Sequence, residues 1–142
     1  MTLHNNLAES AFIIDTDNDN DQFGTDSNSK VLVAQTRSTT VKLYDGSTPQ
    51  TLKTNGGLSV ELKYEDDTSV PITGTSAVAT YTATPSTGVV EVTILQNTNT
   101  AFSHSAIKAV ITATDTNNRS KQTTFTIRKV MSGQPGLSPI IY

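Results

Sequence analysis

The sequence predicts an all-β fold, an immunoglobulin-like antiparallel β-sandwich of about seven strands. Composition is the first reason, because the 142 residues include 25 threonines and 11 valines, whose β-branched side chains favour strands. Apolar and polar residues also alternate with period two through most of the chain, as they do in half-buried strands. These runs recur at intervals of roughly 8 to 20 residues with no helical window between them, a spacing typical of a two-sheet sandwich.

The first third of the chain is predicted to contain three strands, and only the last of them shows a clear alternation of apolar and polar residues. Residues 1–10 are polar and aperiodic, and we expect them to be disordered. A short apolar strand, AFIID, begins at residue 11 and leads into an Asp- and Asn-rich stretch. The segment KVLVAQ, residues 30–35, is predicted to be an edge strand. The strand TTVKLYD follows, with Val41 and Leu43 on its inner face.

Five clearer strands follow in the rest of the chain. In LSVELKYE, Leu62 and Tyr64 fall on one face, and Glu61 and Lys63 fall on the other. The other four strands are AVATYTA, VVEVTIL, AIKAVITAT and TTFTIRK. The inward positions predict one core made of Val41, Leu43, Val60, Leu62, Tyr81, Val92, Ile94, Ile107, Ala109, Ile111, Phe125 and Ile127.

The segments between these strands have the composition of tight turns. TPSTG places Pro85 and Gly88 between two alternating runs, and DTNN, residues 115–118, forms a polar tip between two others. Neighbouring strands are therefore expected to pair antiparallel. The sequence has no cysteine and no tryptophan, so the sandwich lacks the disulfide and the core Trp of antibody domains.

The domain is expected to occupy residues 11–131. Gly133, Pro135, Gly136 and Pro139 punctuate the last stretch, so residues 132–142 are interpreted as a Gly/Pro linker to a following module. In that interpretation, the final Ile-Ile-Tyr is the start of the next unit.

Charge and hydropathy exclude several classes of partner. The net charge is −3, the pI is near 5.2, and the 10 Lys and Arg residues are scattered, so no nucleic-acid partner is expected. No run approaches the roughly 20 apolar residues of a spanning helix, so we expect no membrane insertion. Without cysteine, the chain has no disulfide, zinc thiolate or thiol nucleophile.

The acidic stretch DTDNDND is the candidate for a metal site. Asp15, Asp17, Asp19 and Asp21 alternate with Thr and Asn, which resembles the oxygen-rich spacing of a calcium loop. Asn20 stands where such a loop requires glycine, and no helices flank the stretch. We expect a solvated connection, since Asp and Asn side chains bond their own backbone in turns. A calcium site at the four Asp residues is the alternative, and no other cofactor is expected.

Catalysis is not expected. His4 and His104 are far apart in the sequence, and no strand-turn-helix context exists to activate a serine nucleophile. His104 is interpreted as a polar residue of a connection. Asp66 and Asp67 are interpreted as a turn at the end of a strand rather than as an acid pair.

Three parts of the chain resemble a known kind of module. AFIIDTDNDNDQFGTDSNSKV, then STTVKLYDG, then AVITATDTNNRSKQTTFTIRKVMSGQPGLSP are similar to the Ig-like modules of tail and tail-fibre proteins of bacteriophages and prophages of gut bacteria. The matching features are the Asp/Asn stretch after a short apolar strand, the Leu43–Gly46 hairpin start, and the Lys129 strand end before a Gly-rich junction. The single collagen-like triplet at the Gln-Pro-Gly junction departs from the long repeat of that family.

The resemblance implies a function without catalytic residues. It implies a spacer or display module of a phage tail, located in the virion and supporting attachment to the host surface. Its partners would be neighbouring modules of the same chain, in a parent protein that could be a homo-oligomer. The alternative hypothesis is a module of a bacterial cell-surface adhesin that binds carbohydrate or protein through its Thr-, Ser- and Asn-rich loops. Few aromatic residues remain outside the predicted core for sugar binding, which favours the spacer.

Overall fold

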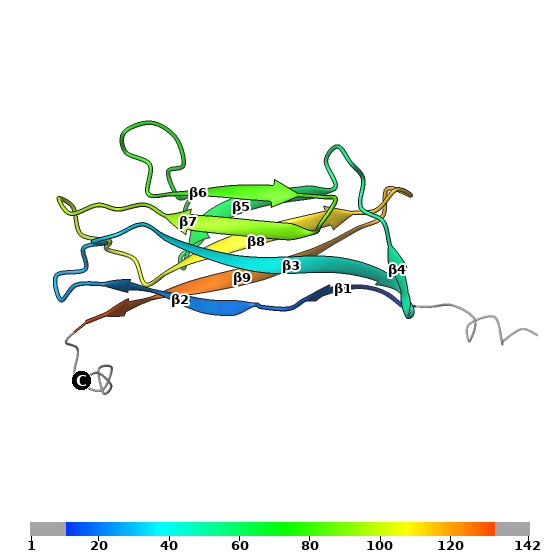
Figure 1. Cartoon of the computed structure of the whole chain (residues 1–142), viewed down its shortest axis with the longest axis horizontal. Coiled ribbons are helices and arrows are strands. Elements are labelled where there is room, and N and C mark those ends of the chain that lie inside the picture. The colour runs from blue at the N-terminus through cyan, green and yellow to red at the C-terminus, as the bar shows by residue number, and fades with distance from the viewer. Residues whose placement is uncertain (1–10, 133–142) are drawn as a thin grey trace, which may run out of the picture.

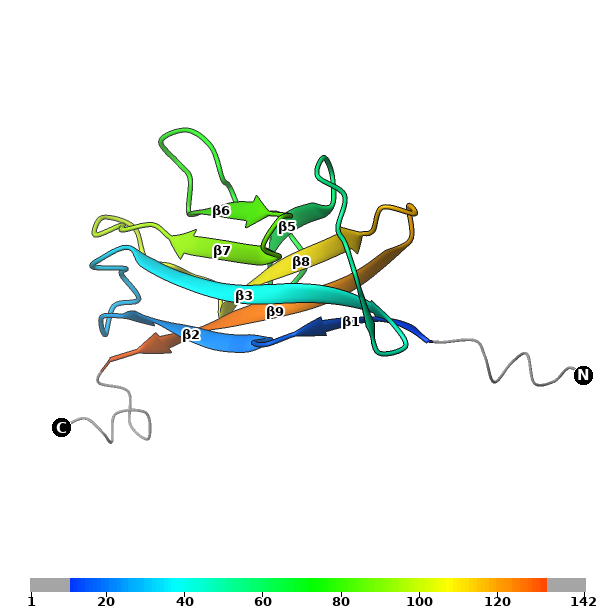
Figure 2. The same ribbon diagram turned by 45° about the vertical axis from the view of Figure 1, so that its right-hand side comes forward.

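The computed structural model describes residues 11–132, which form an all-β domain of two sheets packed face to face (Figures 1 and 2). Within this range no helix is long and apolar enough to cross a membrane. Two predictions concern residues outside this range: the disordered segment at residues 1–10 and the linker beyond Ser132. The strands are β1 (Phe12–Thr16), β2 (Asn20–Thr25), β3 (Gln35–Asp45), β4 (Thr48–Gln50), β5 (Leu58–Tyr64), β6 (Ala79–Thr84), β7 (Val89–Ile94), β8 (Ala106–Thr114) and β9 (Ser120–Met131).

The sheet topology is that of an immunoglobulin domain. The first sheet has the order β1-β3-β7-β6, with β4 also paired to β3, and the second has the order β2-β9-β8-β5. With β3 as strand B and β5 as strand C, these are the B-E-D and C-F-G sheets of the immunoglobulin fold. The first strand is divided between them, because β1 pairs with β3 and β2 pairs with β9. The predicted fold class is confirmed.

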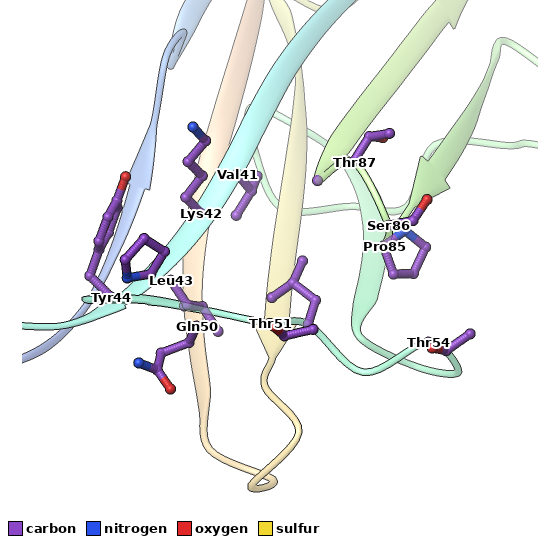
Figure 3. A pocket seen from close by; sticks show the side chains of 13 residues that line it. Val41, Lys42, Leu43, Tyr44, Gln50, Thr51, Thr54, Pro85, Ser86 and Thr87 are labelled. Carbon is purple, nitrogen blue, oxygen red and sulfur yellow. The ribbon is translucent and has the colours of Figure 1, made fainter. Parts of the chain in front are cut away.

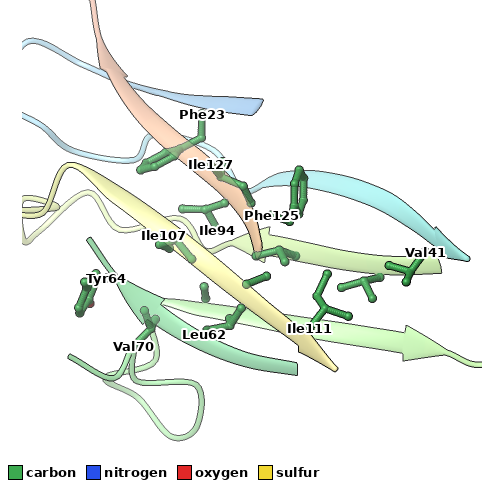
Figure 4. Packing of buried hydrophobic residues seen from close by; sticks show 14 of the residues in the cluster. Phe23, Val41, Leu62, Tyr64, Val70, Ile94, Ile107, Ile111, Phe125 and Ile127 are labelled. Carbon is green, nitrogen blue, oxygen red and sulfur yellow. The ribbon is translucent and has the colours of Figure 1, made fainter. Parts of the chain in front are cut away.

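The core lies between the two sheets and contains every residue predicted for it (Figure 4). Val60 and Tyr81 are only partly buried, and the other predicted core residues are buried. The core also contains four residues that lie outside the alternating runs and were not predicted for it. One is Phe23, which comes from the acidic stretch, and the other three lie in the end connections. These are Val31, Val70 and Phe102. Period-two alternation cannot identify them, because the connections are not regular strands.

The predicted hairpins are present. The strands β6 and β7 pair antiparallel, as do β8 and β9. Gly88 has φ of +76°, and a Cβ there would lie 2.3 Å from the carbonyl oxygen of Val41, so both the turn and the close approach require glycine. Asn118 takes φ of +64° in the other turn, a conformation that asparagine tolerates better than most residues.

One expected strand is absent, and two further strands and one parallel pairing were not expected. Residues 30–35 do not form an edge strand: Val31 makes an isolated bridge with Asn97, while Leu32 and Val33 are 50% and 62% exposed. This segment must cross from the sheet of β2 to the sheet of β3, so it cannot run along either. The structure has nine strands rather than about seven, since β2 and β4 were not predicted. The pairing of β2 with β9 is parallel, so neighbouring strands are not all antiparallel.

The domain boundary is close to the predicted residue 131. The strand β9 ends at Met131, and the backbone N–H of Ser132 still donates to the carbonyl oxygen of Thr25 at 3.0 Å. The pairing therefore extends one residue into the segment that was interpreted as linker.

The described chain begins and finishes at opposite ends of the long axis (Figures 1 and 2). We call the end that holds Ala11 the leading end; its connections are residues 46–47, 51–57, 85–88 and 115–119. The end that holds Ser132 is the trailing end, with connections 26–34, 65–78 and 95–105.

A buried carboxylate organises the leading end. Asp115 is fully buried and accepts hydrogen bonds from the backbone N–H groups of Asn117 and Arg119, both at 2.9 Å. The Arg119 guanidinium bonds Asp115, Asp45 and Gln50 and lies 4.3 Å above the ring of Phe12. Through these contacts, the β8–β9 turn is joined to β1, β3 and β4.

Replacing Asp115 tests how much this network stabilises the domain. Asp115→Ala leaves two backbone N–H groups and the guanidinium without their acceptor, and we expect it to lower the free energy of unfolding by about 2–3 kcal/mol. Asp115→Asn keeps an acceptor oxygen for the backbone N–H groups but places an amide NH2 donor against the Arg119 guanidinium, so it loses the ion pair and keeps the turn, and its effect should be about half as large. Urea unfolding followed by circular dichroism measures both. An equal loss of unfolding free energy in the two variants would contradict the expectation that the turn and the ion pair each contribute part of the stabilisation.

The same carboxylate predicts a pH dependence. Burial alone raises the pKa of Asp115, but hydrogen bonds from the backbone of Arg119, from its guanidinium and from the backbone of Asn117 outweigh it and hold the pKa below its usual value. The stabilisation is thus complete above the unfolded-state pKa, near 4, and is lost as the pH falls through the folded-state value. Unfolding free energies measured between pH 7 and pH 2 should decline below about pH 4. The decline should be shallower for Asp115→Asn, and an unchanged slope would contradict this assignment.

Candidate functional site

A hollow with a volume of about 550 Å³ lies at the leading end (Figure 3). It forms because β7 leaves β3 after Thr40, while β4 pairs only with Leu43–Asp45. A hydrogen bond from Val41 N–H to the Gly88 carbonyl, at 2.8 Å, holds the 85–88 turn against β3. The lining residues are Val41, Lys42, Leu43, Tyr44, Pro49, Gln50, Thr51, Leu52, Thr54, Pro85, Ser86, Thr87 and Gly88.

This hollow has an apolar floor and a polar rim. The floor includes the buried Val41 and Leu43, and the rim carries hydroxyls, the amide of Gln50 and one ammonium group, that of Lys42. The lining contains no carboxylate, histidine or cysteine. A neutral ligand with hydroxyl or amide groups is the kind of molecule that the rim could hydrogen-bond.

A second cluster, at the trailing end, brings together Glu65, Asp66 and His104, whose ligand atoms lie within 4.8 Å of one another. The His104 ring lies 3.6 Å from the Tyr64 ring, nearly parallel to it, and its Nδ1 is 2.9 Å from Glu65 Oε2. The other oxygen of Glu65 accepts from the backbone N–H of Ser105 at 3.0 Å.

The contacts of this cluster explain its carboxylates as supports of two connections. Desolvation raises the pKa of Glu65, but the hydrogen bonds from His104 and from the backbone of Ser105 and Ala106 hold it below its usual value. Asp66 accepts from the backbone N–H of Thr68 at 3.1 Å and from its hydroxyl at 2.6 Å. The predicted turn at Asp66 and Asp67 is confirmed, and His104 lies in a connection as predicted. No motif in the sequence indicates that these two connections meet.

No serine completes a catalytic arrangement within residues 11–132. The hydrogen bond formed there by the His104 ring is the one to Glu65, so no serine hydroxyl is placed for activation. His4 lies outside the described residues.

The four Asp residues of the acidic stretch point to different partners. Asp15 lies on β1 opposite Lys42, and Asp17 Oδ1 accepts from the backbone N–H of Thr40 at 2.8 Å. The carbonyl of Asp19 accepts from the N–H of Thr126 at 3.0 Å. Asp21 accepts from Asn18 Nδ2 at 3.0 Å and lies 3.5 Å from Arg37 Nε.

This stretch is therefore strand and crossing rather than a free loop. Asp15 is in β1, Asp21 is in β2, and the residues between them carry the chain from one sheet to the other. The described groups of three or more metal-ligating side chains do not include any of the four Asp residues. The expected connection without bound calcium and the alternative, a calcium site at Asp15, Asp17, Asp19 and Asp21, both stay untested.

Comparisons with known proteins bear on the fold and not on the function. No protein-family model matches the chain, and no curated protein matches it. One similar solved structure is the N-terminal Ig1-2 module of the Drosophila receptor protein tyrosine phosphatase DLAR, with 10% sequence identity and a TM-score of 0.46. The match covers 85% of this chain and 50% of that one, so the chain spans about half of that module.

The contacts of Asp17 and Asp15 predict different effects for the two side chains. Asp17→Ala removes the acceptor of the Thr40 N–H and should lower the free energy of unfolding by about 1 kcal/mol, whereas Asp15→Ala should change it by less than about 0.5 kcal/mol. Urea unfolding in a chelating buffer measures both variants.

Millimolar calcium should leave the melting temperature of the wild type unchanged, because only a ligand that prefers the folded state stabilises it. A clear rise in melting temperature that is abolished by replacing Asp15 and Asp17 with Asn would contradict this expectation and favour the calcium site.

Proposed function

We propose that this chain is a structural module, a spacer or display unit, of a bacteriophage tail or tail-fibre protein that supports attachment to the host surface. The observation that carries the proposal is the placement of the ends of the described chain: Ala11 and Ser132 lie at opposite ends of the long axis (Figure 2). A module of this kind can be joined in a string, in which each unit adds its length to the whole. The resemblance of the acidic stretch, the Leu43–Gly46 hairpin and the Lys129 strand end to tail modules supplies the phage assignment.

The proposed role is passive and non-catalytic. The carboxylates of both ends of the sandwich are held by protein donors, as Asp115 and Glu65 illustrate, so they stabilise connections. In a chain of modules, these hydrogen bonds would keep the end connections of each unit in place. The partners would be neighbouring modules of the same parent protein in the virion.

A second function is favoured by one observation, the hollow at the leading end. Its volume of about 550 Å³ is in the range of small-molecule sites, and Tyr44 with Gln50 could contact a sugar. This supports the alternative of an adhesin module that binds a glycan, or a protein, at the bacterial cell surface.

Immunogold electron microscopy separates the two proposals. Antibodies raised against the purified chain should label the tails of phage particles released after prophage induction in the strain that encodes it. Labelling of the cell envelope, with none on particles, would contradict the tail assignment and favour the adhesin.

A glycan array probed with the purified protein is the companion experiment. The spacer proposal expects no binding. The control is Ser59→Ala, because Ser59 does not line the hollow. A glycan that binds the wild type and this control but not Tyr44→Ala would favour the adhesin.

A further inference from the structure

The free edges of the two sheets differ in how they are protected. An edge strand carries N–H and C=O groups that can pair with another strand, and proteins usually block them with charges, proline or a covering segment. The edge strands here are β1, β6 and the short β4, which contains Pro49, in one sheet and β2 and β5 in the other.

The edge of β2 is closed by side chains of β3. The amide of Gln35 bonds both backbone groups of Gly24: its Oε1 accepts from the N–H at 2.8 Å, and its Nε2 donates to the C=O at 2.8 Å. Arg37 Nε donates to the carbonyl of Gln22 at 2.7 Å. The outward backbone groups of this strand are therefore already bonded.

The other two protected edges are blocked in different ways. Half of the β5 edge is covered by the chain that follows it, since Val70 N–H donates to Leu62 C=O and Tyr64 N–H donates to Thr68 C=O. The strand β5 also carries the charges of Glu61 and Lys63. The strand β1 carries the exposed Asp15, and the Arg119 guanidinium lies over its first residue, Phe12.

The edge of β6 is covered only at its start, where the N–H of Ala79 lies 3.5 Å from the Pro71 carbonyl, and its stretch from Tyr81 to Ala83 has none of these protections. The N–H of Leu95 donates to the carbonyl of Val78, so in the antiparallel pair Thr80 and Thr82 direct their backbone groups toward β7. The N–H and C=O groups of Tyr81 and Ala83 consequently point away from the sheet. Within residues 11–132, no hydrogen bond outside the strand ladders reaches them. The strand, ATYTAT, contains no charge and no proline.

We propose that β6 pairs antiparallel with β6 of a second copy of this chain, around a two-fold axis that passes through Thr82. In this register, Tyr81 exchanges hydrogen bonds with Ala83 of the second copy, and Ala83 does so with its Tyr81. The four outward backbone groups of each strand are then all bonded. The result is one continuous sheet through both copies, in the order β1-β3-β7-β6-β6-β7-β3-β1.

The side chains of β6 are complementary to themselves in this register. On the exposed face, Thr82 meets Thr82 and Thr80 meets Thr84, which are favourable cross-strand pairs without like charges. On the inner face, the half-buried Tyr81 meets the small Ala83, so a large side chain faces a small one. A two-fold interface needs such self-complementarity, and this is why a second copy is the occupant that the edge fits best.

The size of the contact sets the expected affinity. A pairing of the five residues Thr80–Thr84 on each side buries less than the roughly 800 Å² per partner of a standard interface, so the dissociation constant should lie in the range of about 0.1–1 mM. Such a contact matters where copies are held close together, and it rests on the described residues without requiring the proposed function.

A cysteine placed on the axis tests the register directly. The position of Thr82 is a non-hydrogen-bonded pair, where Cα atoms are about 4.5 Å apart and a disulfide can close. The chain has no cysteine of its own, so a Thr82→Cys variant can form only the dimer across the axis. We expect it to form a covalent dimer at least about tenfold faster than Ser59→Cys, a matched control on the exposed face of the β5 edge.

Sedimentation equilibrium of the uncrosslinked protein, up to about 2 mM, is the second measurement. The wild type should dimerise, and Thr82→Lys, which brings two like charges together at the axis, should raise the dissociation constant at least about tenfold. The control Ser59→Lys and a deletion of residues 133–142 should leave it unchanged. Circular dichroism confirms that each variant is folded.

Three outcomes would overturn the proposal. One is a wild type that remains monomeric over the whole concentration range. Another is a dimer that Thr82→Lys does not weaken or that deletion of residues 133–142 abolishes, because either would place the interface elsewhere. The third is equal crosslinking rates for the two cysteine variants.

Discussion

The rest of the fold depends on the point where the first strand leaves one sheet for the other. Residues 17–19 make this crossing, and buried Thr39 holds it by donating its hydroxyl to the carbonyl of Asn18 at 2.5 Å. Before the crossing, β1 pairs antiparallel with β3; after it, β2 pairs parallel with β9. The segment from β1 to β2 therefore supplies an edge strand to each sheet, and it brings Phe23 into the core. A carboxylate-rich sequence suits a crossing because its oxygens can accept the backbone N–H groups that the interrupted ladder leaves unpaired.

The two ends of the sandwich are closed by different chemistry. At the leading end, the Asp115–Arg119 pair links the β8–β9 turn to the first sheet through Asp45. At the trailing end, Phe102 of the 95–105 connection packs on two rings of the second sheet, 4.9 Å from Phe23 and 5.9 Å from Tyr64, both in edge-to-face arrangements. Lys129 on β9 donates to the Phe102 carbonyl at 2.8 Å and ties the last strand to this cluster. The connections at both ends are therefore held against the strands of the sandwich.

The polar groups of this domain are largely engaged with one another, and this limits the chemistry open to it. Glu65 and His104 bond each other, and the carboxylate of Asp17 receives a backbone N–H. The places that remain for a partner are a hollow lined by neutral groups and the backbone edge of β6. Both favour association, with a neutral ligand in one case and with a strand in the other.

The sequence by itself determined the fold class, most of the strands and the sandwich core, because alternation with period two depends on which face of a strand is buried. The inward face of Leu62 and Ile111, for example, follows from their neighbours in the chain alone. Only the tertiary structure decided that Asn20–Thr25 is a strand, because its stability comes from pairing with β9, about 100 residues later, and not from local propensity. The same holds for the Leu32 and Val33 connection, for the meeting of Glu65 with His104, and for the Arg119 contacts. Each depends on where distant segments lie in space, and a pattern read along the chain carries no information about that distance.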